Sequence, residues 1–231
     1  MRNTTLIRRV SAFILVALCI TTFLYYITKK QEGAKADSQK NIALNYNWLT
    51  NPACFPPCWN GIKPGKSTLL QSLDVLLKAN TVEEIVIGKS TGRGLVEWEE
   101  TKISEGGRLF YDDTDTIVYA IEPQINCCSR LKDAIKIYGE PSHVIILASQ
   151  IFEEPNVGDW IYSYNIIWLE IGMEAKGSPK TDGEINENFS ISSIAYFVPS
   201  KDGLQKYEGR IADLMVNWKG YNNRSFYLIE K

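Results

Sequence analysis

Histidine is nearly absent from this sequence, because His143 is the single one among 231 residues. Zinc proteases of the His-Glu-x-x-His type need two histidines on one helix, so that class is excluded. A serine or cysteine hydrolase would have to use His143 as its base, and the Gly-x-Ser-x-Gly turn that presents a nucleophilic serine is missing. We therefore predict no catalytic residue, and we interpret His143 as the start of a surface strand.

Motifs for cofactors and metals are incomplete. The segment Gly65–Thr68 matches the end of a phosphate-binding loop, but Asn60 stands where that motif needs its first glycine. Residues 112–115 (Asp-Asp-Thr-Asp) form one acidic cluster and residues 97–100 (Glu-Trp-Glu-Glu) another, without the central glycine and closing glutamate of a calcium loop. We interpret the first motif as a helix-capping turn and residues 112–115 as a solvated hairpin turn. The sequence predicts no cofactor-binding or metal-binding residue.

Basic residues are scarce beyond the N-terminus. Residues 1–30 hold five of the 25 basic residues and no acidic one, so the rest of the chain carries 20 basic against 27 acidic groups, a net of −7. Nucleic-acid binding needs clustered lysine and arginine to neutralise phosphates. The acidic body excludes general nucleic-acid binding, and we predict no nucleic-acid partner.

The N-terminal region contains one long apolar run, from Val10 to Ile27, without a charged residue. As a helix it would be roughly 27 Å long, close to the ~30 Å hydrocarbon core of a bilayer. Tyr25 and Tyr26 fall at its distal end, where amphipathic rings favour the membrane interface. We predict an N-terminal transmembrane helix that is kept as a single-pass anchor in the plasma membrane, with the body outside the cytoplasm.

Two alternatives to an uncleaved anchor are open. Ala34-Lys35-Ala36 has the small-x-small form of a signal-peptide cleavage site, so the body could be secreted after cleavage near Ala36. Lipidation at Cys19 is the other alternative. All of these interpretations place the body outside the cytoplasm, provided that the N-terminus stays inside.

The body contains an even set of four cysteines, Cys54, Cys58, Cys127 and Cys128. Behind a secretory-type segment, an even number of cysteines indicates disulfides. Three connectivities are possible, and we favour two bridges that join the 54/58 segment to the 127/128 segment. Each would close a loop of about 70 residues, worth roughly 4 kcal/mol in the chain-entropy model. A thiolate metal site and free redox-active thiols are the alternatives.

Apolar periodicity predicts two helices in the body. The first spans Leu69 to Leu77 and is capped by Ser67 or Thr68. The second runs through residues 131–138, with Ser129 as its N-cap and Gly139 as its end. Residues 203–218 are expected to add a closing helix.

Alternating and β-branched patterns predict strands after each helix, with polar residues 172–188 as a loop. The expected strands are residues 85–87, 95–102, 108–111 and 117–121 in the first half and 144–147, 160–171 and 191–198 in the second. The predicted class is α+β, with an N-terminal transmembrane helix followed by tandem repeats of a helix and an antiparallel β-meander. The expected organisation is an anchor at 1–30, a polar linker at 31–45, a first repeat at 46–125 and a second repeat with a C-terminal extension at 126–231.

Two short motifs carry a family resemblance. The turn Gly61-Ile62-Lys63-Pro64-Gly65 before a helix, and the helix ending Tyr138-Gly139-Glu140-Pro141, resemble the repeat unit of the β-lactamase-inhibitor-protein-like (BLIP-like) fold and of the SmpA/OmlA family of small bacterial envelope lipoproteins. The chain also looks like uncharacterised membrane-anchored bacterial envelope proteins of this layout. The first helix departs from the pattern, since it ends without Gly-x-Pro. The resemblance implies a binding module rather than a particular activity.

Aromatic residues gather on the expected strands and form a candidate binding surface. Its members are Trp98, Trp160, Tyr162, Tyr164, Trp168 and Tyr196. Tryptophan and tyrosine concentrate binding energy when they project from a sheet, here toward a protein or glycan partner. Packing in the core and between neighbouring strands is the alternative for these rings.

The sequence thus predicts a non-enzymatic, membrane-anchored binding or scaffolding protein of the cell envelope whose ligand is unknown. The alternative is an envelope enzyme, either a thiol-disulfide oxidoreductase that uses Cys54 and Cys58 or a carboxylate-based hydrolase.

Overall fold

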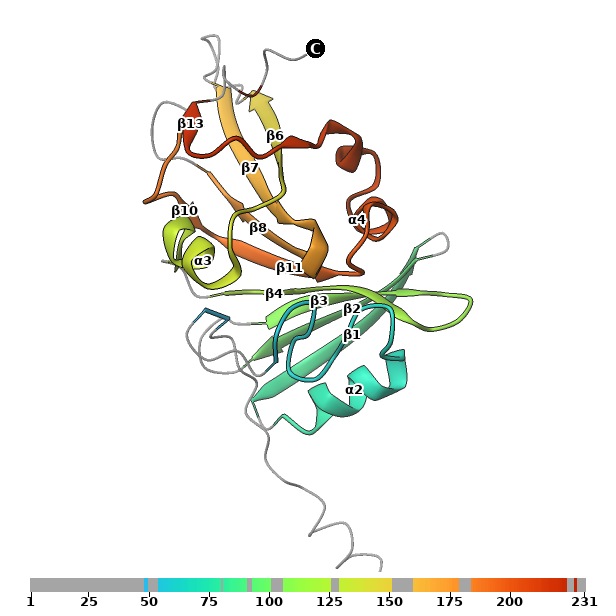
Figure 1. Ribbon diagram of the computed structural model, residues 1–231. Coiled ribbons are helices and arrows are strands. Elements are labelled where there is room, and N and C mark those ends of the chain that lie inside the picture. The colour runs from blue at the N-terminus through green and yellow to red at the C-terminus, as the bar shows by residue number, and fades with distance from the viewer. Residues whose placement is uncertain are drawn as a thin grey trace, which may run out of the picture. The chain divides into compact units, whose positions relative to one another are not determined.

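A nine-stranded antiparallel sheet organises the part of the chain that the computed structural model describes (Figure 1). The described residues are 48–49, 54–79, 81–90, 93–100, 106–125, 129–150, 160–178, 184–223 and 227, and they all fall within the unit Ala43–Lys231. The strands follow the order β1-β2-β3-β4-β11-β8-β7-β6-β12 across the sheet. The pairing of β4 with β11 joins the N-terminal and C-terminal strands into one continuous sheet.

The large sheet consists of β1 (Val82–Ser90), β2 (Arg93–Glu100), β3 (Gly106–Asp112), β4 (Val118–Pro123), β6 (His143–Gln150), β7 (Trp160–Trp168), β8 (Met173–Gly177), β11 (Ser193–Phe197) and β12 (Val216–Asn217). Two small pairs accompany it: β5 (Ser129–Arg130) with β10 (Ser190–Ile191), and β9 (Glu184–Ile185) with β13 (Asn222–Asn223).

The helices are short. They are α2 (Leu69–Leu77), α3 (Leu131–Tyr138) and α4 (Lys201–Glu208), with 3-10 turns η1 (Leu169–Ile171) and η2 (Gly209–Leu214). The capping prediction for α2 is confirmed, because the Thr68 side chain accepts a hydrogen bond from the backbone N–H of Gln71, and the backbone N–H of Thr68 donates the reciprocal capping-box bond to the Gln71 side chain. The N-cap predicted for α3 is wrong, since Ser129 lies in β5 and α3 begins after Arg130 without a side-chain cap. The predicted end at Gly139 is confirmed.

The predicted fold class is wrong: the described residues form a mainly antiparallel β structure with three short α-helices. The closing helix expected over residues 203–218 is one reason. Gly209 ends α4 with a φ of 64°, and the chain continues as a 3-10 turn and then as β12. The two halves also do not form separate sheets, because the pairing of β4 with β11 joins their strands into one.

The expected membrane anchor lies outside the described residues, whereas the expected polar loop is corrected by the structure. Within the described ranges, none of the helices is both long enough and apolar enough to cross a bilayer. Residues 10–27, where the membrane segment was expected, lie outside the described residues. The loop expected at 172–188 contains β8, which lies inside the sheet between β7 and β11.

The sheet has two faces with different covers. On the face called here the α2 face, Val96, Trp98 and Leu109 pack with residues of α2 and α3 in one hydrophobic cluster. On the opposite α4 face, Phe197 and Ala120 pack with Leu204 of α4 in a second cluster. Strand alternation places neighbouring residues on opposite faces, so the polar residues between these apolar positions point away from their own cluster. The α4 face therefore carries several polar side chains where α4 and η2 do not cover it.

Candidate functional site

A groove of about 610 Å³ crosses the α4 face where the first four strands and β11 lie side by side. Strand pairing explains its lining, because Glu97 lies opposite Arg108 on the next strand and Arg108 lies opposite Glu122 on the strand after that. Val86 of β1 completes this row opposite Glu97. Successive residues of one row share a face, so four strands contribute one side chain each to the same surface.

Acidic side chains dominate the groove. Among the described residues, its lining includes Glu84, Glu97, Glu99 and Glu122 against Arg108 as the one cation, a formal net charge of −3. The guanidinium of Arg108 donates a hydrogen bond from Nη2 to Oε2 of Glu122 at 2.9 Å, and Glu122 is only 12% exposed. Arg108 thus already has a carboxylate partner, while Glu84, Glu97 and Glu99 lie at exposed positions.

Two of these carboxylates face each other directly. Glu84 on β1 lies opposite Glu99 on β2. Like charges at opposite positions of neighbouring strands destabilise the pair. The register itself brings this repulsion about, because the apolar residues Ile85 and Ile87 must face the α2 side opposite Trp98 and Val96. A positively charged ligand in the groove would relieve the repulsion.

The carboxylates are spread over the groove rather than gathered at one point. Among the residues that the structure describes, no three histidine, cysteine, aspartate or glutamate side chains are grouped so that they could hold a metal ion. The groove therefore suits an extended ligand with several positive charges.

A buried polar network lies on the same sheet face under α4. Glu174 of β8 is fully buried, and its Oε1 accepts a hydrogen bond of 2.7 Å from Nδ2 of Asn165. The ammonium of Lys176 lies 3.4 Å from Oε2 of Glu174 and donates a hydrogen bond of 2.7 Å to Glu208 of α4. It also lies 3.2 Å from the hydroxyl oxygen of Tyr207. The network ties helix α4 to the sheet through one shared cation.

The electrostatics of this network differ from those of the groove. Burial raises the pKa of Glu174 to about 8; the Lys176 ammonium opposes the rise and the Glu208 carboxylate adds to it. Burial disfavours the charge on Lys176, but Glu174 and Glu208 outweigh it and raise the pKa of Lys176. Glu122 of the groove lies near enough to contribute to the same rise. Glu174 therefore holds its proton more tightly than an ordinary glutamate, beside the carboxyl group of Glu208.

A pair of neighbouring carboxyl groups, one of them with a raised pKa, is the combination that acid-base hydrolysis uses. However, the Glu174 side chain is completely buried and lies beneath α4. A substrate in the groove would meet Glu122 and Arg108, which are already bonded to each other. The arrangement fits a structural clamp for α4 rather than a catalytic pair.

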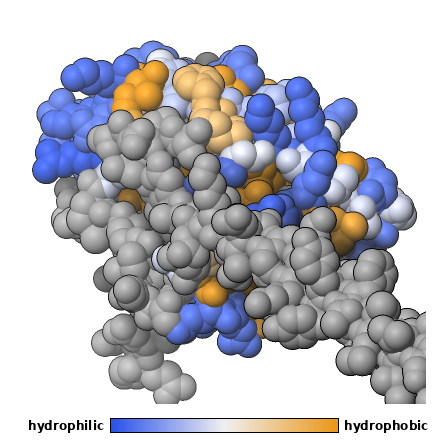
Figure 2. Space-filling view, turned by 90° about the horizontal axis from the view of Figure 1, so that it is seen from below, coloured by the Kyte–Doolittle hydropathy of each residue, from blue (hydrophilic) through white to orange (hydrophobic). Residues whose placement is uncertain are grey.

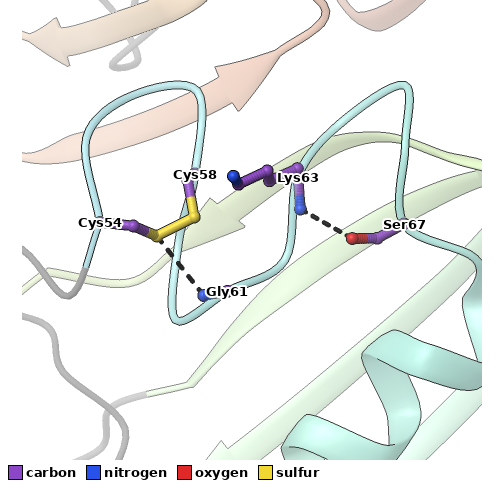
Figure 3. Close-up of a disulfide and its surroundings, with 5 residues drawn as sticks. All are labelled: Cys54, Cys58, Gly61, Lys63 and Ser67. Atoms are coloured by element: carbon purple, nitrogen blue, oxygen red, sulfur yellow. Dashed lines mark hydrogen bonds between the residues drawn. A yellow bond between two sulfur atoms is a disulfide. The ribbon is translucent and has the colours of Figure 1, made fainter.

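The disulfide of this chain lies on a tight loop before α2 (Figure 3). Cys54 bonds to Cys58, and the backbone N–H of Gly61 points toward Sγ of Cys54 at 3.4 Å. The favoured pairing of these two cysteines with Cys127 and Cys128 is wrong, because both are already joined to each other. Cys127 and Cys128 lie outside the described residues. The two cysteines of the loop Cys-Phe-Pro-Pro-Cys are only four residues apart and bond to each other within the loop.

Four of the six predicted surface aromatics lie in the core instead: Trp98, Tyr164, Trp168 and Tyr196. Trp98 packs across Gly107 of the next strand, where a Cβ atom would come within 2.4 Å of the ring, and it stacks on Trp59. Burial raises the pKa of Tyr196 well above its ordinary value.

The other two predicted aromatics are Tyr162 and Trp160. Tyr162 is partly buried, and the side chain of Trp160 lies outside the described residues. The described aromatics therefore form no continuous exposed surface on the sheet.

Three interpretations of polar motifs can be compared with the structure. Residues 113–115 form a turn in which the Asp112 carboxylate accepts hydrogen bonds from Thr114, as expected for a hairpin turn. Bonds from Lys206 and Thr114 hold the pKa of Asp112 well below its ordinary value. The Gly65–Thr68 motif caps α2, which confirms its interpretation. His143 begins β6 and is partly buried, which lowers its pKa.

The groove carboxylates could be found in the sequence only in part. Glu97 and Glu99 stand two residues apart on one strand, which places them on one face. Their partners Glu84, Arg108 and Glu122 come from three other strands, and only the register brings them together.

No protein-family model matches the sequence, and neither a curated protein nor a solved structure matches it significantly. The resemblance to the BLIP-like fold and to the SmpA/OmlA family stays a prediction.

Proposed function

We propose that this chain is a non-enzymatic binding protein that holds a positively charged segment of a partner protein in its acidic groove. The observation that carries the proposal is the row of Glu97, Arg108 and Glu122 beside the opposed pair Glu84 and Glu99. Lysine or arginine side chains of a ligand would pair with the exposed carboxylates and relieve the repulsion between Glu84 and Glu99.

A protein segment suits this groove better than a glycan does. Uncharged glycans are commonly gripped by aromatic rings, and four of the six strand aromatics are buried in the core. The groove instead offers acidic side chains spaced along neighbouring strands. An extended basic peptide presents its charges at a similar repeat.

The compartment is part of the proposal. We place the body outside the cytoplasm, with the apolar residues 10–27 holding the chain at the plasma membrane of the cell that makes it. The Cys54–Cys58 disulfide supports an oxidising compartment, because such bonds persist mainly outside the cytosol. The charge-free run of residues 10–27 supports association with a membrane.

The experiment measures binding of a labelled peptide rich in lysine and arginine to the full-length chain in non-ionic detergent, by fluorescence anisotropy. The double variant Glu97→Gln/Glu99→Gln removes two groove charges. Glu184→Gln/Glu187→Gln is the matched control, because both of its side chains are exposed and neither lines the groove. We expect about tenfold weaker binding for the groove variant, since each exposed ion pair is worth up to about 1 kcal/mol.

Two results support the proposal together. Of the two variants, only the groove variant loses affinity for the peptide, and the affinity of the unaltered chain falls as added salt screens the charges. Equal losses in the groove variant and its control would show general attraction to an acidic protein and would refute the assignment. No binding by the unaltered chain at low salt would refute it as well.

A further inference from the structure

Strand β1 forms the end of the large sheet. It is nine residues long and pairs with β2 on one side, and no other strand of the described residues pairs with its outer edge. An open edge offers backbone N–H and C=O groups to another strand. The side chains at its centre are apolar and exposed: Val86 is 49% exposed and Ile87 is 52% exposed.

Helix α2 adds apolar surface on the sheet face to which Ile85 and Ile87 belong. Leu70 and Leu77 are 77% and 72% exposed, and they lie seven residues apart on one side of the helix. Figure 2, which looks from the side where α2 lies in Figure 1, shows apolar surface among hydrophilic residues there. An exposed apolar edge strand with exposed leucines on the helix beside it is typical of a protein interface.

The sequence of β1 is complementary to itself in the antiparallel direction. When two copies are aligned about Val86, Val86 meets Val86 and Ile85 meets Ile87 of the other copy. Moving outward, Glu84 meets Gly88, and the bulged Glu83 comes next to Lys89, so opposite charges lie close together at both ends. The bulge between Val82 and Glu84 places Glu83 at the irregular end of this alignment and leaves the central five residues, 84–88, regular.

Neighbouring alignments lack this match. Opposite residues of an antiparallel pair must lie on the same face of the sheet. The centre of the alignment must therefore fall on a residue, such as 85, 86 or 87, and not between two residues. A centre at residue 85 places Glu83 against Ile87, and a centre at residue 87 places Lys89 against Ile85. Charge and hydrophobicity therefore favour a single register.

We propose that β1 pairs with β1 of a second copy of this chain, antiparallel about Val86. The two-fold axis passes midway between the two Val86 residues, perpendicular to the sheet, and it relates two sheets that are joined edge to edge. The same faces then align, so the two helices α2 lie on one side and the two acidic grooves on the other. Glu84 and Val86 belong to both the groove and the pairing strand, so the dimer places one groove beside the other.

Lys89 has a partner within its own chain, which the test must take into account. Its ammonium lies 3.1 Å from Oδ1 of Asp113, and that contact raises the pKa of Lys89. Lys89 remains 67% exposed, and an ammonium can donate three hydrogen bonds, so it can reach Glu83 of the other copy as well.

The first experiment measures the mass of the full-length chain in detergent micelles by sedimentation across a concentration series. Glu83→Lys and Lys89→Glu each turn two attractions per dimer into two repulsions, and we expect the dissociation constant to rise about tenfold. The combined variant Glu83→Lys/Lys89→Glu restores opposite charges and is expected to restore the dimer. Asp113→Asn is the control, because it removes only the intrachain partner of Lys89.

The outcomes separate this register from other modes of association. A monomeric unaltered chain overturns the proposal, and so does a dimer that neither charge reversal weakens. A loss in Asp113→Asn as large as in Lys89→Glu also overturns it, since the loss would then arise within one chain. Far-ultraviolet circular dichroism confirms that each variant is folded.

The second experiment tests the register directly. Val86→Cys places two thiols opposite each other on the two-fold axis, within the distance of a disulfide. Ile87→Cys is the matched control. Residue 87 of one copy faces residue 85 of the other, so the two residues 87 lie further apart than the two residues 86. We expect mild oxidation to link Val86→Cys through a peptide pair that contains residue 86, as read by mass spectrometry. Linkage of Ile87→Cys alone would overturn the register.

Discussion

The substitution Glu174→Gln tests whether a protonated carboxyl holds α4 on the sheet. Glu174 is fully buried, accepts a hydrogen bond from Asn165 and lies beside the ammonium of Lys176. From α4, Glu208 and Tyr207 face the same ammonium. Glutamine keeps the size of the side chain and the acceptor oxygen but has no acidic proton to lose. The substitution therefore isolates the ionisation of one group within the network.

The direction of the pH dependence follows from the raised pKa. The pKa of Glu174 is about 8 in the folded protein against an ordinary value of 4.5. Between these values the unfolded chain releases the proton and the folded chain keeps it, so unfolding becomes easier as the pH rises. The stabilisation is complete below about pH 4.5 and is lost as the pH rises through about 8. With about 1.4 kcal/mol per pKa unit, the whole loss is at most about 5 kcal/mol.

The assay is urea unfolding followed by tryptophan fluorescence, from pH 5 to pH 9, on the unaltered chain and on Glu174→Gln. We expect the free energy of unfolding of the unaltered chain, minus that of the variant, to fall by several kcal/mol across this range. Glu170→Gln serves as the control, because Glu170 is exposed on the turn after β7. Parallel profiles for the unaltered chain and Glu174→Gln would refute the reasoning, since the carboxyl would then titrate alike in both states.

Two further predictions concern the α2 face and the disulfide. Gly94→Ala should lower the free energy of unfolding by about 1–3 kcal/mol, because the new Cβ would lie 1.9 Å from the Tyr111 ring; in Gly88→Ala, where the nearest atom is 4.0 Å away, urea unfolding should show little change. Replacing Cys54 and Cys58 together with serine should cost about 2 kcal/mol, the chain-entropy value for so short a loop, and an unchanged urea midpoint would contradict it.

Local sequence patterns were sufficient where each element follows from its own residues. The apolar spacing of Leu69, Leu73 and Leu76 predicts α2, and Thr68 stands at the capping position where the structure has it. The β-branched runs around residues 85–87 and 144–147 lie within β1 and β6. These elements bury one regular face each, so their periodicity is visible without knowledge of their neighbours.

Local patterns failed where the environment comes from distant residues. Met173-Glu-Ala-Lys-Gly177 looks like a polar loop, yet it is an inner strand in which Glu174 is fully buried and Lys176 is partly buried at α4. Nothing in the sequence indicates that Glu208, more than thirty residues later, supplies the partner that makes Lys176 acceptable there. The aromatics show the converse, since Trp98 is buried because Gly107 on the neighbouring strand leaves room for its ring.

On the α4 face, the environment of a glutamate depends on whether helix α4 covers it. Glu97 and Glu174 lie on the same face of one sheet, on β2 and β8, and both alternate with apolar residues. Glu97 is open to water, where charge costs little and can attract a basic ligand. Glu174 lies beneath α4, where burial makes the charged form unfavourable and the carboxyl keeps its proton.

The boundary between these two environments runs through Glu122. That residue is bonded to Arg108 in the groove and also contributes to the raised pKa of Lys176 under α4. A ligand that draws Arg108 or Glu122 toward itself would therefore change the field at the clamp of α4. Because linkage is reciprocal, binding of a basic peptide should in turn shift the pH range over which the clamp loses its proton. Titrating peptide affinity from pH 6 to pH 9 in the unaltered chain and in Glu174→Gln would measure this coupling, and identical profiles would show that groove and clamp act independently.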